Sequence, residues 1–220
     1  MTEAGDRAAF LANARRRLGG RIPANPVHVP PAPTAVPPEV RFTALDRADV
    51  VGSFVAVATE VDAAVHRVAQ VDLASQVLDL AREHDAAAVV HSAEPELAPL
   101  VAALSEARLT VDLYSADAAV TADLGLTGSV AGIAATGSVV LDASVAGSRA
   151  AGLLPPVHVC VLREDQVVAT PADVLHRLSA GAPSSLVLVG GPSRTGDVEQ
   201  ILTLGVHGPR HVHILLVAPD

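Results

Sequence analysis

The chain has 220 residues, half of them hydrophobic, and carries 24 acidic against 15 basic residues for a formal net charge of −9. This length and apolar content suffice for one buried core, and the negative charge argues against nucleic acid or an anionic membrane as the main partner. Because only 2% of the residues are aromatic and none is Trp, the chain is also poorly supplied with stacking surfaces for bases.

The first 39 residues predict an arm outside the core. Residues 6–18 carry apolar side chains at helical spacing, which predicts a short amphipathic helix. Seven prolines between residues 23 and 38 forbid a regular helix and favour an extended linker. We therefore expect an arm of residues 1–39 that docks on its own domain, a neighbouring copy or a partner, followed by a globular domain of residues 40–220.

Helical and strand patterns alternate from residue 40 onward, which predicts an α/β fold with a mostly parallel sheet flanked by helices. The expected helices are 46–59, 73–83, 96–107 and 172–178, with a short helix or turn at 148–154. The expected strands are 64–68, 87–91, 110–114, 138–142, 157–162, 167–169, 186–189 and 211–217.

Small residues punctuated by glycine fill residues 125–141. Such a run predicts close backbone packing or close approach of a ligand. A hairpin or sharp bend is expected at Thr136 and Gly137, leading into the strand that starts at Ser138.

The strand at 186–189 is followed by Gly-Gly-Pro-Ser-Arg-Thr-Gly-Asp and then by apolar residues at helical spacing. This pattern predicts a buried strand feeding a helix, with Asp197 and Glu199 in the first turn. Unpaired amides and the dipole at a helix start suit a carboxylate or phosphate. The alternative is an ordinary capped turn with no ligand, in which both acids only stabilise the helix start.

Two segments with glycines and hydroxyl groups stand at ends of predicted strands, so a parallel sheet could join them in one polar pocket for an anion. The candidate binding residues are Thr136, Gly137, Ser138, Arg149, Gly191, Ser193, Arg194 and Thr195. The arginines would neutralise the anion, Glu199 would act as base or nucleophile, and His207 would carry a proton.

Nine histidines raise the question of a metal site, since His207, His211 and His213 cluster near the C-terminus and His158 could stand on a neighbouring strand. Their spacing is not that of a metal motif, and we expect ordinary histidines and no metal. Cys160, the one cysteine, lies in an apolar run and cannot by itself hold an iron–sulfur cluster. No nucleotide-binding glycine motif opens a helix, so no cofactor is expected in this chain.

Three ordered motifs resemble the LUD-domain family, in particular its LutC/YkgG lactate-utilization branch. They are Leu-Leu-Pro-Pro-Val-His at 153–158, Gly-Pro-Ser-Arg-Thr-Gly-Asp-Val-Glu at 191–199 and Gly-Val-His-Gly-Pro at 205–209. Ala135 departs from the acidic residue that the family usually has before Thr-Gly. The resemblance covers mainly residues 130–220 and implies a fold like the NagB/RpiA/CoA-transferase group.

The resemblance also implies a part in oxidising L-lactate to pyruvate, beside an iron–sulfur partner protein and a cysteine-rich partner protein. The first functional hypothesis is therefore a non-redox subunit of such a system. The alternative is a free-standing enzyme of the CoA-transferase or sugar-phosphate-isomerase type that uses Glu199. No membrane span and no signal peptide are expected, and the predicted location is the cytoplasm.

Overall fold

A computed structural model describes residues 13, 16, 46, 48–178, 183, 185–196, 202–204 and 207–219 of the chain. The predicted amphipathic helix and proline linker lie outside the described residues, except for residues 13 and 16, so the division at residue 39 stays a prediction. Within the described part, no helix is long and apolar enough to cross a membrane.

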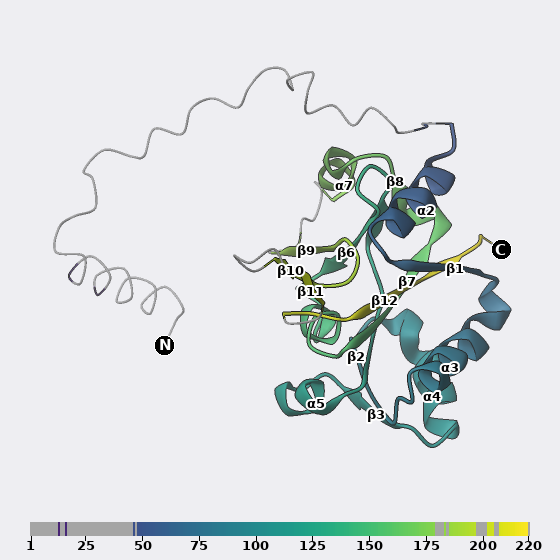
Figure 1. The fold of residues 1–220 in the computed structure, drawn as a ribbon, viewed down its shortest axis with the longest axis vertical. Helices are drawn as coiled ribbons and strands as arrows, with labels where there is room; N and C mark the ends of the chain where they lie inside the picture. Colours follow the sequence, from purple (N-terminus) through teal and green to yellow (C-terminus); the bar gives the residue numbers. More distant parts are fainter. Residues whose placement is uncertain are drawn as a thin grey trace. The chain divides into compact units, whose positions relative to one another are not determined.

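The centre of the fold is a six-stranded sheet in which every neighbouring pair is parallel (Figure 1). This confirms the α/β class with a parallel sheet. In spatial order its strands are β1 (Ala64–Val68), β12 (His211–Val217), β7 (Val157–Arg163), β4 (Leu124–Thr127), β2 (Ala88–His91) and β3 (Thr110–Leu113).

Helices α3 (Leu73–Glu83) and α4 (Ala98–Glu106) cover one face of this sheet. The apolar stripe of α3 buries Leu73, Val77 and Leu80 against strand residues such as Val159 and Leu215. The helix forms where the sequence predicts it because this stripe has helical spacing and a sheet face to cover. Short 3₁₀ turns at Gln70–Asp72 and Pro95–Leu97 lead into the two helices.

The opposite face carries a second, four-stranded sheet and helix α2 (Val50–Glu60). Asp49 caps α2 by accepting a hydrogen bond from the Gly52 amide at 2.7 Å. Phe54 of α2 and Leu162 of β7 are both fully buried in the core between these layers. The second sheet consists, in order, of β8 (Val167–Val168), β5 (Ala131–Ile133), β6 (Ser138–Asp142) and β9 (Leu186–Val189).

Three short helices complete the described fold: α5 (Ala116–Thr121), α6 (Ser148–Ala151) and α7 (Pro171–Arg177). Thr170 and Asp173 form a capping box at the start of α7, with Pro171 in the first turn. The sequence does not predict α5, β4 or β5. Glycines interrupt the apolar pattern of β4 and β5, so the pattern does not indicate strands. Gly125 and Gly132 stand where other chain segments approach the backbone closely.

The region after β9 corrects a prediction, because it pairs as strands where a helix was expected. Residues Arg194–Gly196 form β10, which runs antiparallel to β11 (Leu202–Leu204). Strand β9 also differs from the prediction, because it joins the second sheet antiparallel to β6 and buries only Val189. Tertiary pairing here overrides the helical spacing of a few apolar residues.

Candidate functional site

The carboxyl ends of β2 and β4 mark the point where the chain leaves the parallel sheet in opposite directions. These strands are neighbours, but β2 leads to α4 on one face and β4 leads to β5 in the second sheet on the other face. In open α/β sheets, ligands bind in the crevice at such a switch point. We therefore expect a ligand-binding site at this edge of the sheet.

A cleft of about 330 Å³ lies at this edge, within the size range of small-molecule sites. Its floor is apolar and comes from the parallel sheet and α3, while its walls carry amide, hydroxyl and charged groups. The lining residues are Gln70, Leu73, Pro95, Glu96, Pro99, Ser129, Val161, Arg163, Gln166 and Val217. Except for Leu73 and Pro99, in the helices that follow, they lie in the last residues of a parallel strand or in the turn after it.

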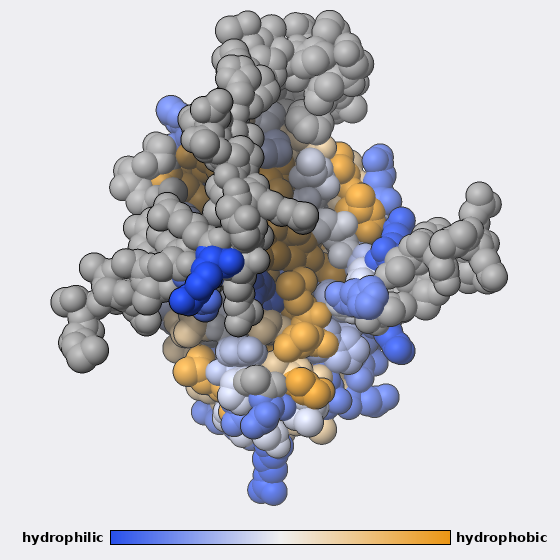
Figure 2. All heavy atoms as spheres, turned by 90° about the vertical axis from the view of Figure 1, so that its left-hand side faces the viewer, coloured by the Kyte–Doolittle hydropathy of each residue, from blue (hydrophilic) through white to orange (hydrophobic). Residues whose placement is uncertain are grey.

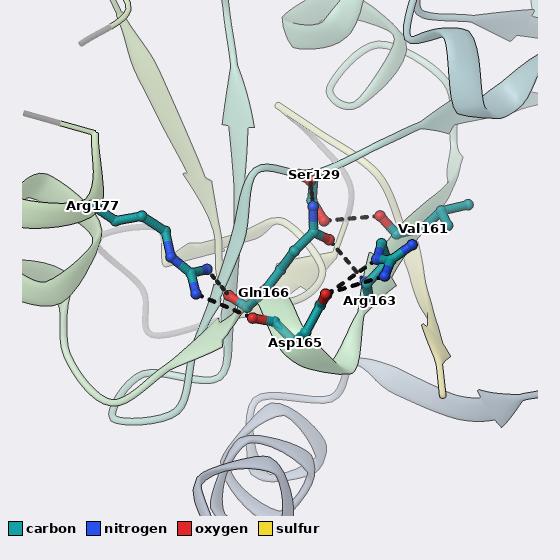
Figure 3. A network of polar contacts seen from close by, with 6 residues as sticks. All are labelled: Ser129, Val161, Arg163, Asp165, Gln166 and Arg177. Carbon is teal, nitrogen blue, oxygen red and sulfur yellow. Dashed lines mark hydrogen bonds and ion pairs between the residues drawn. The ribbon is translucent and has the colours of Figure 1, made fainter. Parts of the chain in front are cut away.

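Hydrogen bonds to the backbone hold one wall of the cleft in place (Figure 3). The Ser129 hydroxyl donates to the Val161 carbonyl at 2.8 Å, and Gln166 Nε2 donates to the Ser129 carbonyl at 3.1 Å. Gln166 Oε1 in turn accepts from the Arg163 amide at 2.9 Å. The turn after β4 and the turn after β7 are thereby joined into one preorganised wall.

Arg163 brings a positive charge to this wall. Its guanidinium forms two hydrogen bonds of 3.1 Å with the carboxylate of Asp165 (Figure 3). The hydrogen bond from Arg163 lowers the pKa of Asp165. Arg177 supports the same turn by donating to the carbonyls of Asp165 and Gln166. Arg163 also lines the cleft, where a planar donor group suits a carboxylate.

Two acids stand at the switch point itself. Glu94 Oε2 is buried and has no hydrogen-bond partner among the described residues. A Cβ on Gly128 would lie 3.0 Å from Glu96 Oε1 and 3.1 Å from Glu94 Cγ, so a larger residue would crowd both acids. Glycine after β4 therefore leaves room for them.

Most polar residues of this cleft stand outside the motifs that the sequence offers. Ser129 lies in the glycine-punctuated run 125–141, whereas Glu96, Arg163 and Gln166 stand near strand ends but belong to no motif. Their position after consecutive parallel strands is the signal that could have found them.

The predicted Thr136 and Gly137 lie in the turn between β5 and β6, as expected for a hairpin, and Ser138 is the first residue of β6. Gly137 has φ +62°, and a Cβ there would lie 2.4 Å from the amide nitrogen of Ala58 in α2. Thr136 Oγ1 is buried without a hydrogen-bond partner among the described residues. The glycine is therefore explained by its packing against α2.

The end of β9 lies beside Ser138, so the predicted segment Gly191–Thr195 begins next to the predicted segment Thr136–Ser138. A Cβ on Gly190 would lie 3.1 Å from Ser138 Oγ, and one on Gly191 (φ +95°) would lie 2.1 Å from the Val61 carbonyl oxygen. The Ser193 amide donates to the Pro209 carbonyl at 2.8 Å. The two segments thus come together, but they pack around the C-terminal end of α2 and not at a helix N-terminus.

The remaining predicted residues lie as follows. Arg194 forms an ion pair with Asp62, just after α2, while the side chain of Thr195 lies outside the described part. Arg149 is exposed on α6 and makes no described hydrogen bond or ion pair with either segment, and His207 is exposed in the loop before β12. Glu199 lies outside the described residues, as does Asp197.

The face bearing β9 and β10 has apolar side chains near its centre and hydrophilic ones toward its edges (Figure 2). Leu188 of β9 is 51% exposed.

The four histidines weighed as metal ligands do not converge. His158 pairs with Val212 in the sheet register, so it faces away from His211 and His213. It is fully buried with Nε2 2.8 Å from Thr127 Oγ1, and burial lowers its pKa to about 4. In the part of the chain that the structure describes, no three His, Cys, Asp or Glu side chains are arranged to hold a metal.

Comparison with known proteins matches the LUD domain to residues 51–217. The chain belongs to the LUD-domain family. It is 31% identical over 149 residues to the uncharacterized protein NMB1437 of Neisseria meningitidis, a match covering 66% of this chain and 61% of that protein. It is 38% identical over 99 residues to lactate utilization protein C of Deinococcus radiodurans, covering 44% of this chain and 47% of the relative.

YkgG, an uncharacterized protein of Escherichia coli, is 34% identical over 102 residues, which cover 44% of each chain. These matches span about half the length of the curated relatives. The fold is also similar to the crystal structure of a DUF162 family protein from Deinococcus radiodurans, with TM-score 0.60 and 27% identity. That match covers 79% of this chain and 99% of the other.

Proposed function

We propose that this LUD-domain chain is a non-redox component of a lactate-utilization system and acts beside iron–sulfur proteins that carry the electrons. Its membership of the family and the similarity to proteins named lactate utilization protein C support the pathway. The observation that carries the division of labour is Cys160, the one cysteine of the chain, which is fully buried. Burial raises its pKa to about 12, and a single buried thiol supports a chain that carries no cluster of its own.

The proposed ligand of the chain is a small carboxylate, held in the switch-point cleft. Arg163 would pair with the carboxylate, and the apolar floor at Val161 and Val217 would accommodate a short carbon chain. A 2-hydroxy or 2-oxo acid such as lactate or pyruvate has this chemistry. The backbone-bound Gln166 keeps the wall in place before the ligand arrives.

The proposal that this chain acts beside separate iron–sulfur proteins is tested in the organism that makes it. Deleting the gene should abolish growth on L-lactate but not on glucose, and the tagged chain from lactate-grown cells should recover proteins that contain iron–sulfur clusters. The purified chain alone should not reduce a dye with lactate. Normal growth of the deletion strain, or dye reduction by the isolated chain, would overturn the proposal.

The ligand is tested by calorimetric titration of the purified chain with L-lactate and with pyruvate. Loss of one charge-assisted hydrogen-bonding group is worth about 1.5–3 kcal/mol, so Arg163→Gln should weaken binding by roughly 10-fold to 100-fold. Arg82→Gln is the matched control, because Arg82 pairs with Asp79 on the surface of α3 and does not line this cleft. Equal affinity of both variants would remove Arg163 from the site. Turnover of an acyl-CoA or a sugar phosphate by the chain alone would favour a free-standing enzyme.

A further inference from the structure

Four histidines from three separate elements gather beside the parallel sheet, at the opposite end of α3 from the cleft. His66 belongs to β1, His84 follows the last residue of α3, and His211 and His213 belong to β12 (Figure 1). The ring of His84 lies 4.8 Å from that of His211 and 4.9 Å from that of His213, measured between centroids. His213 is only 6% exposed.

His213 is the centre of a hydrogen-bonded chain of three imidazoles. Its Nδ1 lies 3.0 Å from His66 Nε2, and its Nε2 lies 2.8 Å from His84 Nε2. A neutral imidazole has one N–H and one lone pair, so neutral His213 donates to one neighbour and accepts from the other. Both bonds are therefore complete when the three rings are neutral, and they join the end of α3 to β1 and β12.

Added protons strain this arrangement. A charged His213 could still donate to both neighbours, but its charge would be buried, and a charge on either neighbour would lie about 3 Å away and repel it. Burial, then the neighbouring His84, His66 and His211 and the more distant His158 of β7, lower the pKa of His213 to about 4.

The pKa values of His66 and His84, the two neighbours of His213, are lowered as well. Burial also lowers the pKa values of His66 and His84, and His211 lowers that of His84 further. Glu83 on α3 is the one acid found to act on this cluster within the described part of the chain, and it opposes both shifts. The net preference is for neutral rings in the folded state.

From this geometry we infer that the chain His66–His213–His84 is a pH-sensitive latch, which holds the end of α3 on the sheet when neutral and releases it on protonation. The latched elements also lead to the cleft. Gln70 follows β1 and Leu73 begins α3, and both residues line the cleft. Acidification would thus loosen one wall of the site from a distance.

The pH dependence of release follows from the difference between the pKa values of His213 in the latched and released states. Because the pKa of His213 is lower in the latched state than in the released state, the end of α3 is held on the sheet above pH 6.5 and is released as the pH falls toward 4. With pKa values of 6.5 when released and about 4 when latched, the opening constant is about 30-fold larger at pH 5 than at pH 8.

Hydrogen exchange of the full chain at pH 5 and pH 8, corrected for intrinsic exchange rates, tests the latch. Protection of amides at the end of α3 should be about 30-fold lower at pH 5 than at pH 8. His213→Gln, which cannot take up a proton, should remove this difference. His176→Gln on α7 is the control and should retain it.

His84→Gln gives a second test, because His84 is only half-buried and the variant does not depend on replacing a core residue. It should reduce the pH-dependent loss of protection several-fold. An unchanged loss in either variant would overturn the latch. Saturable binding of Zn²⁺ at pH 8 that disappears in His213→Gln would also overturn it, because the cluster would then be a metal site.

Discussion

The turn at Gly137 allows a sharp test of whether the Thr-Gly-Ser motif is kept for packing. In Gly137→Ala the new Cβ occupies a backbone with φ +62° and meets the Ala58 amide nitrogen at 2.4 Å. The left-handed conformation costs about 1–2 kcal/mol for a non-glycine residue, and overpacking against rigid backbone adds about 1–3 kcal/mol. We expect the free energy of unfolding to fall by about 2–5 kcal/mol.

Urea denaturation followed by far-UV circular dichroism measures this loss. Gly190→Ala is the matched control, because its Cβ would meet only Ser138 Oγ at 3.1 Å and its φ is not positive. The hydroxyl can rotate away, so the control should lose less than about 1 kcal/mol. If Gly137→Ala unfolds within about 0.5 kcal/mol of the natural chain, the packing argument fails and the glycine is kept for another reason.

Three further predictions concern buried side chains. Burial lowers the pKa of His158 to about 4 in the folded state, so the unfolded chain binds a proton more readily. The free energy of unfolding should therefore be about 2 kcal/mol lower at pH 5 than above pH 6.5 on account of this residue. In urea denaturation, the midpoint of His158→Gln should fall less with decreasing pH than that of the natural chain. Leu162→Ala should cost about 2–5 kcal/mol in denaturant unfolding, because the side chain is fully buried between the two sheets. Cys160 should resist Ellman's reagent in the native chain and react once in urea, and fast reaction of the folded protein would contradict its burial.

The candidate site was only partly predictable. Residues 136–138 and 191–195 were predicted to form one pocket through a parallel sheet. The start of β6 lies beside Gly190 at the end of β9, but these strands pair antiparallel, and the shared anion pocket stays a prediction. The helix expected beyond Ser193 was wrong at β10 and β11, since four apolar residues at helical spacing cannot outweigh pairing between strands. The cleft as a whole was not foreseen, because Ser129 lies in the glycine-punctuated run 125–141 but Glu96 and Arg163 are far from it in sequence and belong to no motif.

The amino-acid sequence by itself determined the elements with strong local signals. The helix Leu73–Glu83 and the strands Ala64–Val68, Ser138–Asp142 and His211–Val217 have the predicted bounds, because periodicity and flanking turn residues act within a few residues of chain. The alternation of these elements also determined the α/β class.

Only the tertiary structure decided the order of the strands and hence where distant residues meet. β12 lies between β1 and β7, which brings His66 and His213 together across 147 positions of sequence. The same order places the switch point between β2 and β4 and opens the cleft there. Such contacts depend on burying both faces of one sheet at once, a long-range condition that no local pattern encodes.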